Sequence, residues 1–329
     1  MRKKRIRINC IRIIGLFLII ILMAGLYKVV LFLLPHFINR LSGDNTKSSD
    51  SEYHNNLPID FEELNSSYYP NEELYSPHAI LLRLNDHKVI FKNKSDEKIY
   101  PASLTKIMTA IVAIENIPNL EETVTLPEKI FTDLYTANAS MAGFLPGEEV
   151  TAIDLLYGTL LPSGADASIG LAFRISGSES EFVRLMNKKA KELGMENTHF
   201  ANATGLHDDN HYTTVKDIAV LLQYALKNET FRNIFTTVRH STDNTNLHPG
   251  GITFYSTLST KTNTYEFDGG KMVGGKTGYT DEAGLCLASV AEKGEYEYIL
   301  VTAGAKGNQY TEQFHIMDAF TVYEKIAKK

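Results

Sequence analysis

The spacing of apolar residues changes along the chain and predicts strands toward both ends of a folded body. Short apolar runs on either side of Asn85 and Asp86, a pair typical of tight turns, predict a hairpin over 79–93. Near the C-terminus, glycines or charged residues separate three more runs, which predict strands over 271–276, 283–292 and 296–304.

Elsewhere in the body, apolar residues recur at helical spacing. The first such run begins just after Pro101, a residue suited to the start of a helix. The pattern predicts helices over 102–114, 152–161, 166–174, 179–193, 214–226 and 313–327. A sheet built from both ends of a chain is typical of an α+β domain, with an antiparallel sheet flanked by helices and a helical lobe. We expect a functional site in the crevice between the sheet and the lobe.

A long apolar run near the N-terminus predicts one transmembrane helix. Residues 13–34 are apolar or small apart from Lys28, and about 20 helical residues cross the core of a bilayer. Six cationic side chains precede the run, so the positive-inside rule places residues 1–12 in the cytoplasm and the body outside the cell membrane. A cleaved signal peptide is the alternative, but Ala24 is the sole alanine before residue 79, so an A-x-A-like cleavage site is missing.

Beyond the predicted membrane helix, we expect an extracytoplasmic linker over 35–77 and a folded domain over 78–329. The linker is rich in Ser, Asn, Asp and Glu from residue 41 onward and has no sustained apolar period. The whole chain is 43% apolar and 22% charged, which is the composition of a packed body rather than of a disordered or collagen-like chain.

Charge and cysteine content exclude two further classes. Residues 1–40 carry eight Lys and Arg and no acid, which leaves 25 basic against 39 acidic residues in the rest of the chain. Because non-specific affinity for phosphate comes from Lys and Arg, we expect no binding to nucleic acid. Cys10 and Cys286 would lie on opposite sides of the membrane, so we expect no disulfide, and Cys286 sits in an apolar run typical of a core.

Two short motifs place hydroxyl and amine side chains together. Ser103 and Lys106 lie three residues apart at the start of a predicted helix, so the amine can reach the hydroxyl proton. Ser95 and Lys98 have the same spacing, but they lie in a charged turn without an apolar face to bury the lysine. The second motif, Lys276-Thr277-Gly278, ends a predicted strand and precedes a turn.

A third motif lies between them in the sequence. Ser163 follows Leu161-Pro162 and stands between two predicted helices. With this order of motifs, residues 75–329 resemble the serine D-alanyl-D-alanine carboxypeptidases, the low-molecular-weight penicillin-binding proteins of the peptidase S11 type, whose motifs are Ser-x-x-Lys, Ser-x-Asn and Lys-Thr-Gly. Segments 101–110, 204–219 and 274–284 are also similar to that family.

The resemblance implies a β-lactamase/transpeptidase-like fold and a membrane-anchored enzyme. It implies removal of the C-terminal D-Ala from peptidoglycan stem peptides ending in D-Ala-D-Ala, through an acyl-enzyme that β-lactams also form as inhibitors. No cofactor and no metal are expected. The lipid bilayer is the other expected partner, through the N-terminal helix.

The resemblance also implies a role for each motif residue. Ser103 would be the nucleophile, Lys106 its general base and Ser163 a proton shuttle. Lys276 and Thr277 would bind the terminal carboxylate of the substrate beside Gly278, while the N–H groups of Ser103 and Tyr279 would form the oxyanion hole. Because an ordinary lysine is charged near pH 7, Lys106 must be buried near the second amine, Lys276.

One departure from the family pattern leaves other hypotheses open. The second motif ends in Ala165 rather than Asn, and Asp166 follows it. The chain could therefore be an impaired relic that binds peptidoglycan or β-lactams. A β-lactamase is disfavoured because a Glu-x-x-Leu-Asn motif is missing between the second and third motifs. A zinc-dependent peptidase is disfavoured too, since His207 and His211 lie in a predicted loop without a third ligand segment nearby.

Overall fold

The computed structural model describes residues 62–63 and 74–326, and residues 56–329 form one compact unit of the chain. Within the described residues, none of the helices is long and apolar enough to cross a membrane. The predicted transmembrane helix at 13–34 lies outside the described residues.

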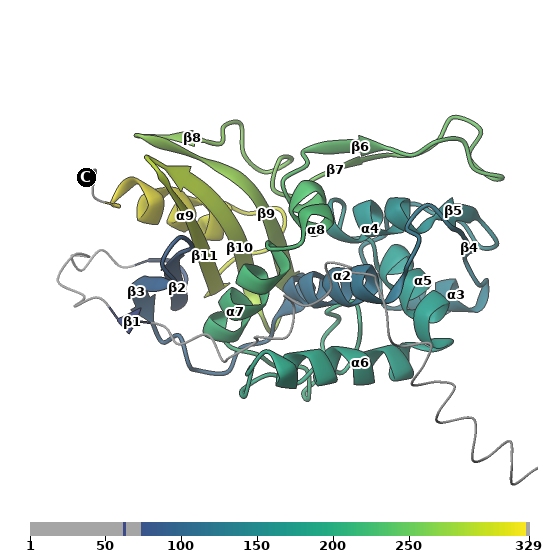
Figure 1. The fold of residues 1–329 in the computed structure, drawn as a ribbon, viewed down its shortest axis with the longest axis horizontal. Coiled ribbons are helices and arrows are strands. Elements are labelled where there is room, and N and C mark those ends of the chain that lie inside the picture. Colours follow the sequence, from purple (N-terminus) through teal and green to yellow (C-terminus); the bar gives the residue numbers. More distant parts are fainter. Residues whose placement is uncertain (1–61, 64–73, 327–329) are drawn as a thin grey trace, which may run out of the picture. The chain divides into compact units, whose positions relative to one another are not determined.

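A seven-stranded sheet forms one side of the described body (Figure 1). Its neighbouring strands run antiparallel except for β1 and β3, which are parallel. In spatial order the strands are β1 (Glu62–Glu63), β3 (Lys88–Asn93), β2 (His78–Arg83), β11 (Tyr296–Ala305), β10 (Gly284–Lys293), β9 (Gly270–Thr280) and β8 (Glu266–Phe267).

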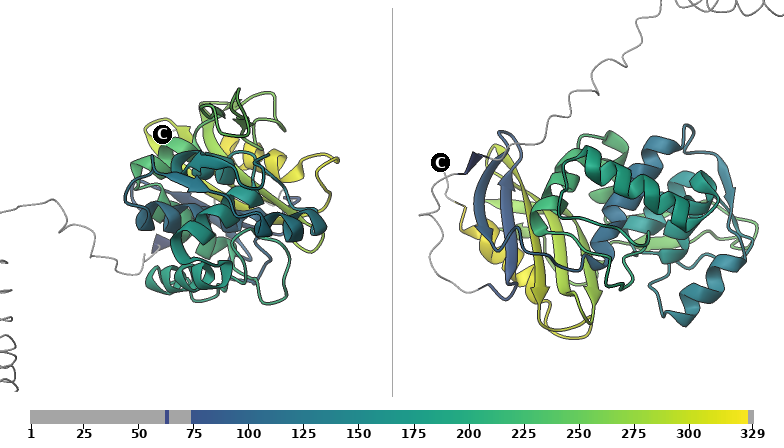
Figure 2. Two further views of the ribbon diagram at one scale, coloured as in Figure 1. Left: turned by 90° about the vertical axis from the view of Figure 1, so that its right-hand side faces the viewer. Right: turned by 90° about the horizontal axis from the view of Figure 1, so that it is seen from below.

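Helices cover both faces of this sheet, which explains why its central strands contain continuous apolar runs. On one face, Leu81, Leu287 and Leu300 pack with α9 (Phe314–Glu324). On the other, Ile80 and Val301 belong to the larger core, into which α7 (Val215–Ala225) packs against β11 and β2. Figure 2 shows the sheet edge-on with helices on either side. Strands buried on both faces lack the polar-apolar alternation of a half-exposed sheet.

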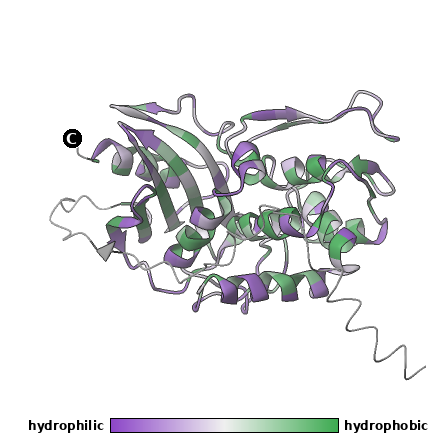
Figure 3. Cartoon of the chain, in the orientation of Figure 1, coloured by the Kyte–Doolittle hydropathy of each residue, from purple (hydrophilic) through white to green (hydrophobic). Residues whose placement is uncertain are grey.

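The helical lobe is built around α2 (Thr105–Asn116), which follows a 3₁₀ turn, η1 (Ala102–Leu104). Nine consecutive residues of α2, Thr105 to Ala113, are buried, so this helix is enclosed by its neighbours. Figure 3 shows that α2 is largely apolar, whereas α6 is polar along much of its length. The other helices of the lobe are α3 (Lys129–Thr136), α4 (Ala152–Leu160), α5 (Ala165–Ser176), α6 (Glu179–Glu192) and α8 (Glu229–Phe235).

The structure confirms the α+β architecture and the helices and strands predicted for the folded body, to within four residues at each end. It adds elements that the apolar pattern did not indicate. Helices α3 and α8 are short. Two small antiparallel sheets of two strands each pair β4 (Thr123–Thr125) with β5 (Glu149–Thr151) and β6 (Arg239–Ser241) with β7 (Thr253–Tyr255). Strands of three residues are too short to show a period.

Two pieces of the segment predicted as linker lie against the sheet. Strand β1 pairs with β3. The N–H groups of Tyr75 and Ser76 donate to the carboxylate of Asp318 in α9, and the ring of Tyr75 stacks on Phe314 with centroids 4.3 Å apart. The residues just before β2 are therefore part of the packed body.

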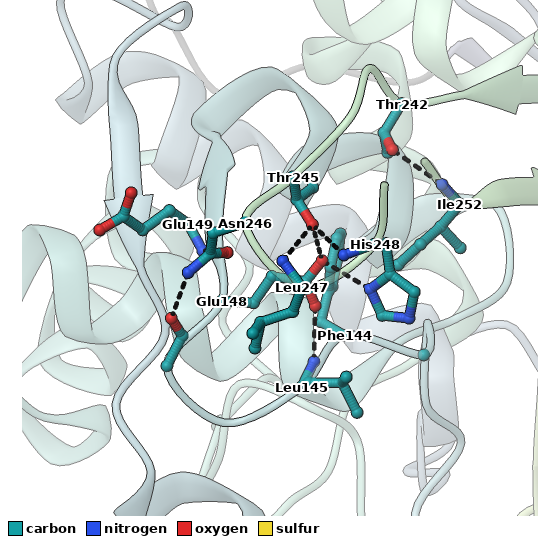
Figure 4. Close-up of polar contacts among 12 residues, drawn as sticks. Phe144, Leu145, Glu148, Glu149, Thr242, Thr245, Asn246, Leu247, His248 and Ile252 are labelled. Atoms are coloured by element: carbon teal, nitrogen blue, oxygen red, sulfur yellow. Dashed lines mark hydrogen bonds and ion pairs between the residues drawn. The ribbon is translucent and has the colours of Figure 1, made fainter. Parts of the chain in front are cut away.

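The β6–β7 hairpin is attached to the helical lobe through two histidines. His240 Nε2 lies 2.7 Å from Asp154 Oδ1, and its ring stacks on Tyr157. Beyond β6, the loop reaches Glu148, whose side chain is 0% exposed (Figure 4). The Glu148 carboxylate accepts from Leu145 N at 2.7 Å and from Thr245 Oγ1 at 2.5 Å, and it lies 2.7 Å from His248 Nδ1. The buried carboxylate of Glu148 thus joins the turn at Leu145 to the loop between β6 and β7.

We expect Glu148→Gln to lower the free energy of unfolding by about 2 kcal/mol, because an amide cannot accept from all three partners of a buried carboxylate. Glu149→Gln is the matched control: its side chain is exposed and points away from the cluster in Figure 4, so a change below about 0.5 kcal/mol is expected. Urea unfolding of the full chain measures both. Equal effects of the two substitutions would contradict a special role for the Glu148 carboxylate.

Candidate active site

Ser103 and Lys106 meet at the junction of η1 and α2. Lys106 Nζ lies 3.2 Å from Ser103 Oγ and donates to the backbone oxygen of Thr204 at 2.5 Å. The lysine is 2% exposed, because α2 is enclosed by the lobe. The predicted contact between hydroxyl and amine on one helix face is therefore confirmed.

Ser163 and Lys276 form a second pair of hydroxyl and amine. Lys276, on β9, is 1% exposed, and its Nζ donates to Ser163 Oγ at 2.9 Å and to Thr277 O at 2.8 Å. Ser163 lies between α4 and α5 with φ of 66°. A left-handed backbone costs a non-glycine residue about 1–3 kcal/mol, and such strained residues are common at functional sites. The motif between the helices thus presents its hydroxyl to the lysine of the sheet.

Strand β9 brings the remaining predicted residues beside η1. A Cβ on Gly278 would lie 3.1 Å from Ser103 N, so glycine allows the strand to approach the nucleophile's backbone closely. Thr277 Oγ1 donates to Thr257 Oγ1 at 2.8 Å. Tyr279 follows Gly278 in the strand, and its hydroxyl donates to Asp281. All seven residues predicted for the site thus lie on η1, α2, the α4–α5 loop or β9.

Burial lowers the pKa of Lys106 to about 7, although the carboxylate of Asp166 acts in the opposite direction. Burial also lowers the pKa of Lys276 well below its usual value, and repulsion from Lys106 and Lys261 adds to this. Two buried amines therefore share the site, as predicted. Removal from water, rather than repulsion by the other amine, is the leading cause of the lowered pKa of each lysine.

The second motif departs from the family pattern, but its variant residues make contacts of their own. Ala165 is buried, and its N–H donates to Ser140 O. The next residue, Asp166, accepts from the N–H groups of three consecutive residues, 142–144, at 2.8–3.1 Å. Asp166 therefore fixes the loop that packs against the Ser163 turn.

The two histidines of the 204–219 segment occupy different surroundings. His207 lies at the surface, 3.6 Å from Glu282 and 3.5 Å from Asp209. His211 is buried beside Thr105. Within the part of the chain that the structure describes, His, Cys, Asp and Glu do not gather in groups that could hold a metal ion. Asp217 accepts from Asn197 N and Thr198 Oγ1, so it braces the start of α7.

Sequence reasoning missed three groups that support the site: the Thr204 carbonyl, the Thr257 hydroxyl and the Asp166 carboxylate. A backbone carbonyl leaves no trace in the side-chain pattern. Asp166 had a visible signal, since an acidic residue in the first turn of a helix is favoured by free N–H groups there. Its partners in the 142–144 loop could not have been read from spacing.

This arrangement is suited to nucleophilic acyl transfer. A serine hydroxyl lies at hydrogen-bond distance from an amine that can be neutral near pH 7, and a second hydroxyl–amine pair lies opposite. The N–H of Ser103 lies at the start of η1–α2 near β9, where donors could face a developing oxyanion.

In comparisons with known proteins, the chain matches one family of enzymes, the D-alanyl-D-alanine carboxypeptidases. The sequence profile described as D-alanyl-D-alanine carboxypeptidase, Peptidase_S11, matches residues 65–307. The D-alanyl-D-alanine carboxypeptidase DacF of Bacillus subtilis is 38% identical over 265 residues, which are 75% of this chain and 62% of DacF. A D-alanyl-D-alanine carboxypeptidase of Streptomyces sp. is 35% identical over 213 residues, 62% of this chain and 72% of the relative.

Solved structures agree in fold. The Streptomyces K15 DD-transpeptidase superposes with a TM-score of 0.69 at 28% identity, covering 77% of this chain and 97% of the other. A D-alanyl-D-alanine carboxypeptidase of Mycobacterium tuberculosis gives 0.67 at 24% identity, with 80% and 96% covered, and shows the shared fold alone. The chain spans less than two thirds of the length of DacF.

Proposed function

Because the chain belongs to the D-alanyl-D-alanine carboxypeptidase family of serine peptidases, peptidase S11, we propose that it removes the C-terminal D-Ala from peptidoglycan stem peptides through an acyl-enzyme. The observation that carries the proposal is the contact between Ser103 Oγ and the buried amine of Lys106. A lysine whose pKa is about 7 has a free base form at neutral pH, which an exposed lysine lacks.

In the first step, the neutral amine of Lys106 takes the proton of Ser103 as Oγ attacks the carbonyl carbon of the penultimate D-Ala. The new C–O bond turns the carbonyl oxygen into an oxyanion. The N–H groups of Ser103 and Tyr279 are the proposed donors to this charge. Collapse of the tetrahedral intermediate breaks the C–N bond.

The departing D-Ala needs a proton on its amine, and Ser163 is placed to pass one from the ammonium form of Lys276. Its hydroxyl already accepts from Lys276 Nζ. Water then attacks the Ser103 ester, giving the shortened peptide and the free serine. In a β-lactam, the broken amide lies in the ring, so the leaving amine stays attached and the ester persists.

The carboxylate of the terminal D-Ala is proposed to bind at Lys276 and Thr277. Burial and the neighbouring amine favour the neutral form of Lys276 in the free enzyme. An arriving carboxylate favours the ammonium form, because an opposite charge raises the pKa of an amine. Binding of the substrate carboxylate would therefore favour the ammonium form of Lys276, which the empty site disfavours.

We propose that residues 13–34 anchor the enzyme in the cell membrane, with the N-terminus in the cytoplasm and the catalytic domain outside. The apolar length of this segment and the six cationic residues before it support the assignment. Release of the full chain from membranes by alkaline carbonate would contradict it.

The second candidate function is a relic that binds stem peptides or β-lactams without turnover. Its support is Ala165, which lacks the amide that the family places beside the substrate. The lysines and hydroxyls of the site remain in contact with one another, and this favours the enzyme over the relic.

The two functions are separated by incubating the purified full chain with a pentapeptide that ends in D-Ala-D-Ala. We expect release of free D-Ala, measured with a D-amino acid oxidase assay, and its loss after pretreatment with penicillin. Covalent labelling by penicillin without D-Ala release would support the relic. Neither labelling nor release would overturn both functions.

A further inference from the structure

The segment 201–206 touches both members of the Ser103–Lys106 pair. The carbonyl of Thr204 accepts from Lys106 Nζ. Gly205, at φ of 82°, lies so close to the Ala102–Ser103 peptide that a Cβ there would be 1.9 Å from Ala102 O. A shift of this segment would therefore move the base relative to the nucleophile.

The buried ring of His211 forms hydrogen bonds with this segment. The ring is 2% exposed, and its Nδ1 accepts from the N–H of Ala201 at 3.1 Å and of Asn202 at 3.4 Å. Nε2 lies 2.7 Å from Thr105 Oγ1. Because Nδ1 faces N–H donors, it carries no proton, and the neutral ring must hold its proton on Nε2. His211 therefore donates to Thr105.

Thr105 carries the contact on to the backbone before the nucleophile. Its hydroxyl donates to Ala102 O at 2.8 Å, which leaves the hydroxyl oxygen to accept from His211. Ala102 has φ of 46°, a left-handed conformation that an alanine adopts only when its surroundings hold it there. A continuous series of hydrogen bonds thus runs from Ala201 N–H through His211 and Thr105 to the residue before Ser103.

We propose that His211 is a positioning residue for the acylation of Ser103, an inference that rests on the proposed function. In its Nε2–H form, His211 joins the segment that holds Lys106 to the turn that carries Ser103. Burial lowers the pKa of His211 to about 4, so the ring remains neutral at the pH where Lys106 acts. The ring orients the reacting groups and exchanges no proton with the substrate.

The test compares His211→Phe with His211→Gln in the full chain, using stopped-flow acylation by a fluorescent penicillin. Phenylalanine keeps a ring but none of the three hydrogen bonds, so the acylation rate constant should fall about 10- to 100-fold, as expected for a small misplacement of reacting groups. The dissociation constant of the initial complex should stay within about threefold. Glutamine offers an acceptor and a donor, and it should recover most of the rate.

His199→Phe is the matched control. His199 is an exposed histidine near the same segment, and its Nδ1 contacts Asn210 O at the base of the loop. We expect its acylation rate constant to stay within about twofold of the unsubstituted chain. Rates are expressed per active site, titrated by the amount of penicillin bound, so that partial unfolding does not count as slow chemistry.

A second pair of substitutions tests the hydrogen bonds of Thr105 rather than the ring of His211. Thr105→Val removes the hydroxyl and should slow acylation as His211→Phe does, whereas Thr105→Ser should be nearly as fast as the unsubstituted chain. Since both changes break one series of hydrogen bonds, the double variant should be no slower than the slower single variant. Additive losses would contradict the connection.

Nitrogen-15 spectra of labelled histidine give a readout that does not depend on activity. The His211 signals, identified by their loss in His211→Gln, should show a protonated Nε2 and a bare Nδ1. A proton on Nδ1, or an unchanged acylation rate in His211→Phe, would overturn the assignment of His211 alone. An unsubstituted chain that penicillin fails to acylate would contradict the proposed function and this inference with it.

Discussion

Ser103→Ala is expected to abolish covalent labelling by fluorescent penicillin and to lower D-Ala release by at least about 1,000-fold. The reason is that Ser103 is the hydroxyl to which Lys106 Nζ is hydrogen-bonded in the described site, so its removal leaves the proposed base without a nucleophile to activate. Labelling is measured on denaturing gels of the full chain, which detect only covalent adducts. Label retained by this variant would remove Ser103 as the nucleophile.

The chain contains its own control for this experiment. Ser95 and Lys98 repeat the Ser-x-x-Lys spacing, but Ser95 Oγ donates to Asp96, and Lys98 Nζ lies over the ring of Tyr212. Ser95→Ala should therefore leave both labelling and D-Ala release unchanged within about twofold. A loss in Ser95→Ala equal to that in Ser103→Ala would show that the different surroundings of the two serines do not decide which of them reacts.

The elements that could be predicted from sequence are those with long apolar patterns. The strands β9, β10 and β11 bury several consecutive residues and leave apolar runs, whereas the helices α2 and α7 bury several consecutive turns and leave apolar residues at helical spacing. The β6–β7 hairpin is held instead by His240, His248 and their buried carboxylate partners. Single polar contacts between distant segments have no period, so no pattern predicts them.

The residues of the candidate site also divide into those that the sequence predicts and those that it does not. Side chains with distinctive chemistry, such as Ser103 and Lys276, could be named from three motifs in order. Their supports could not, because the Thr204 carbonyl and the His211 ring act through backbone geometry that the sequence does not display. The sequence suggests His211 only as a possible metal ligand, whereas the structure buries its ring against Thr105.

Lys106→Met is expected to abolish acylation and, at the same time, to stabilise the fold. Moving the pKa of a lysine from 10.5 to about 7 corresponds to roughly 5 kcal/mol at 1.36 kcal/mol per unit, an upper bound on what burying this amine costs the native state. Methionine has a similar length and no charge to remove from water. Allowing for the lost contact with Thr204, we expect a gain of about 1–3 kcal/mol in the free energy of unfolding at pH 7.

Lys293→Met is the control with the opposite expected sign. Lys293 is also buried, but its Nζ donates to the backbone oxygens of Tyr323 and Glu324 at the C-terminal end of α9. A cation there satisfies free carbonyls and the helix dipole, so its removal should lower the free energy of unfolding by about 1–3 kcal/mol. A loss in both variants would show that Lys106, too, stabilises the fold.

The pH dependence of the same variant tests the cause. Because the native pKa of Lys106 is below its unfolded value of 10.5, the unfolded chain binds more protons between pH 7 and 10.5, and the native state gains stability as pH rises through this range. The advantage of Lys106→Met should therefore be full near pH 7 and vanish toward pH 10.5. In the unsubstituted chain, acylation should rise with pH around a midpoint near 7, since the neutral amine is the base. A midpoint near 10 would mean that Lys106 keeps the proton affinity of an exposed lysine, and that the buried amine is not what activates Ser103.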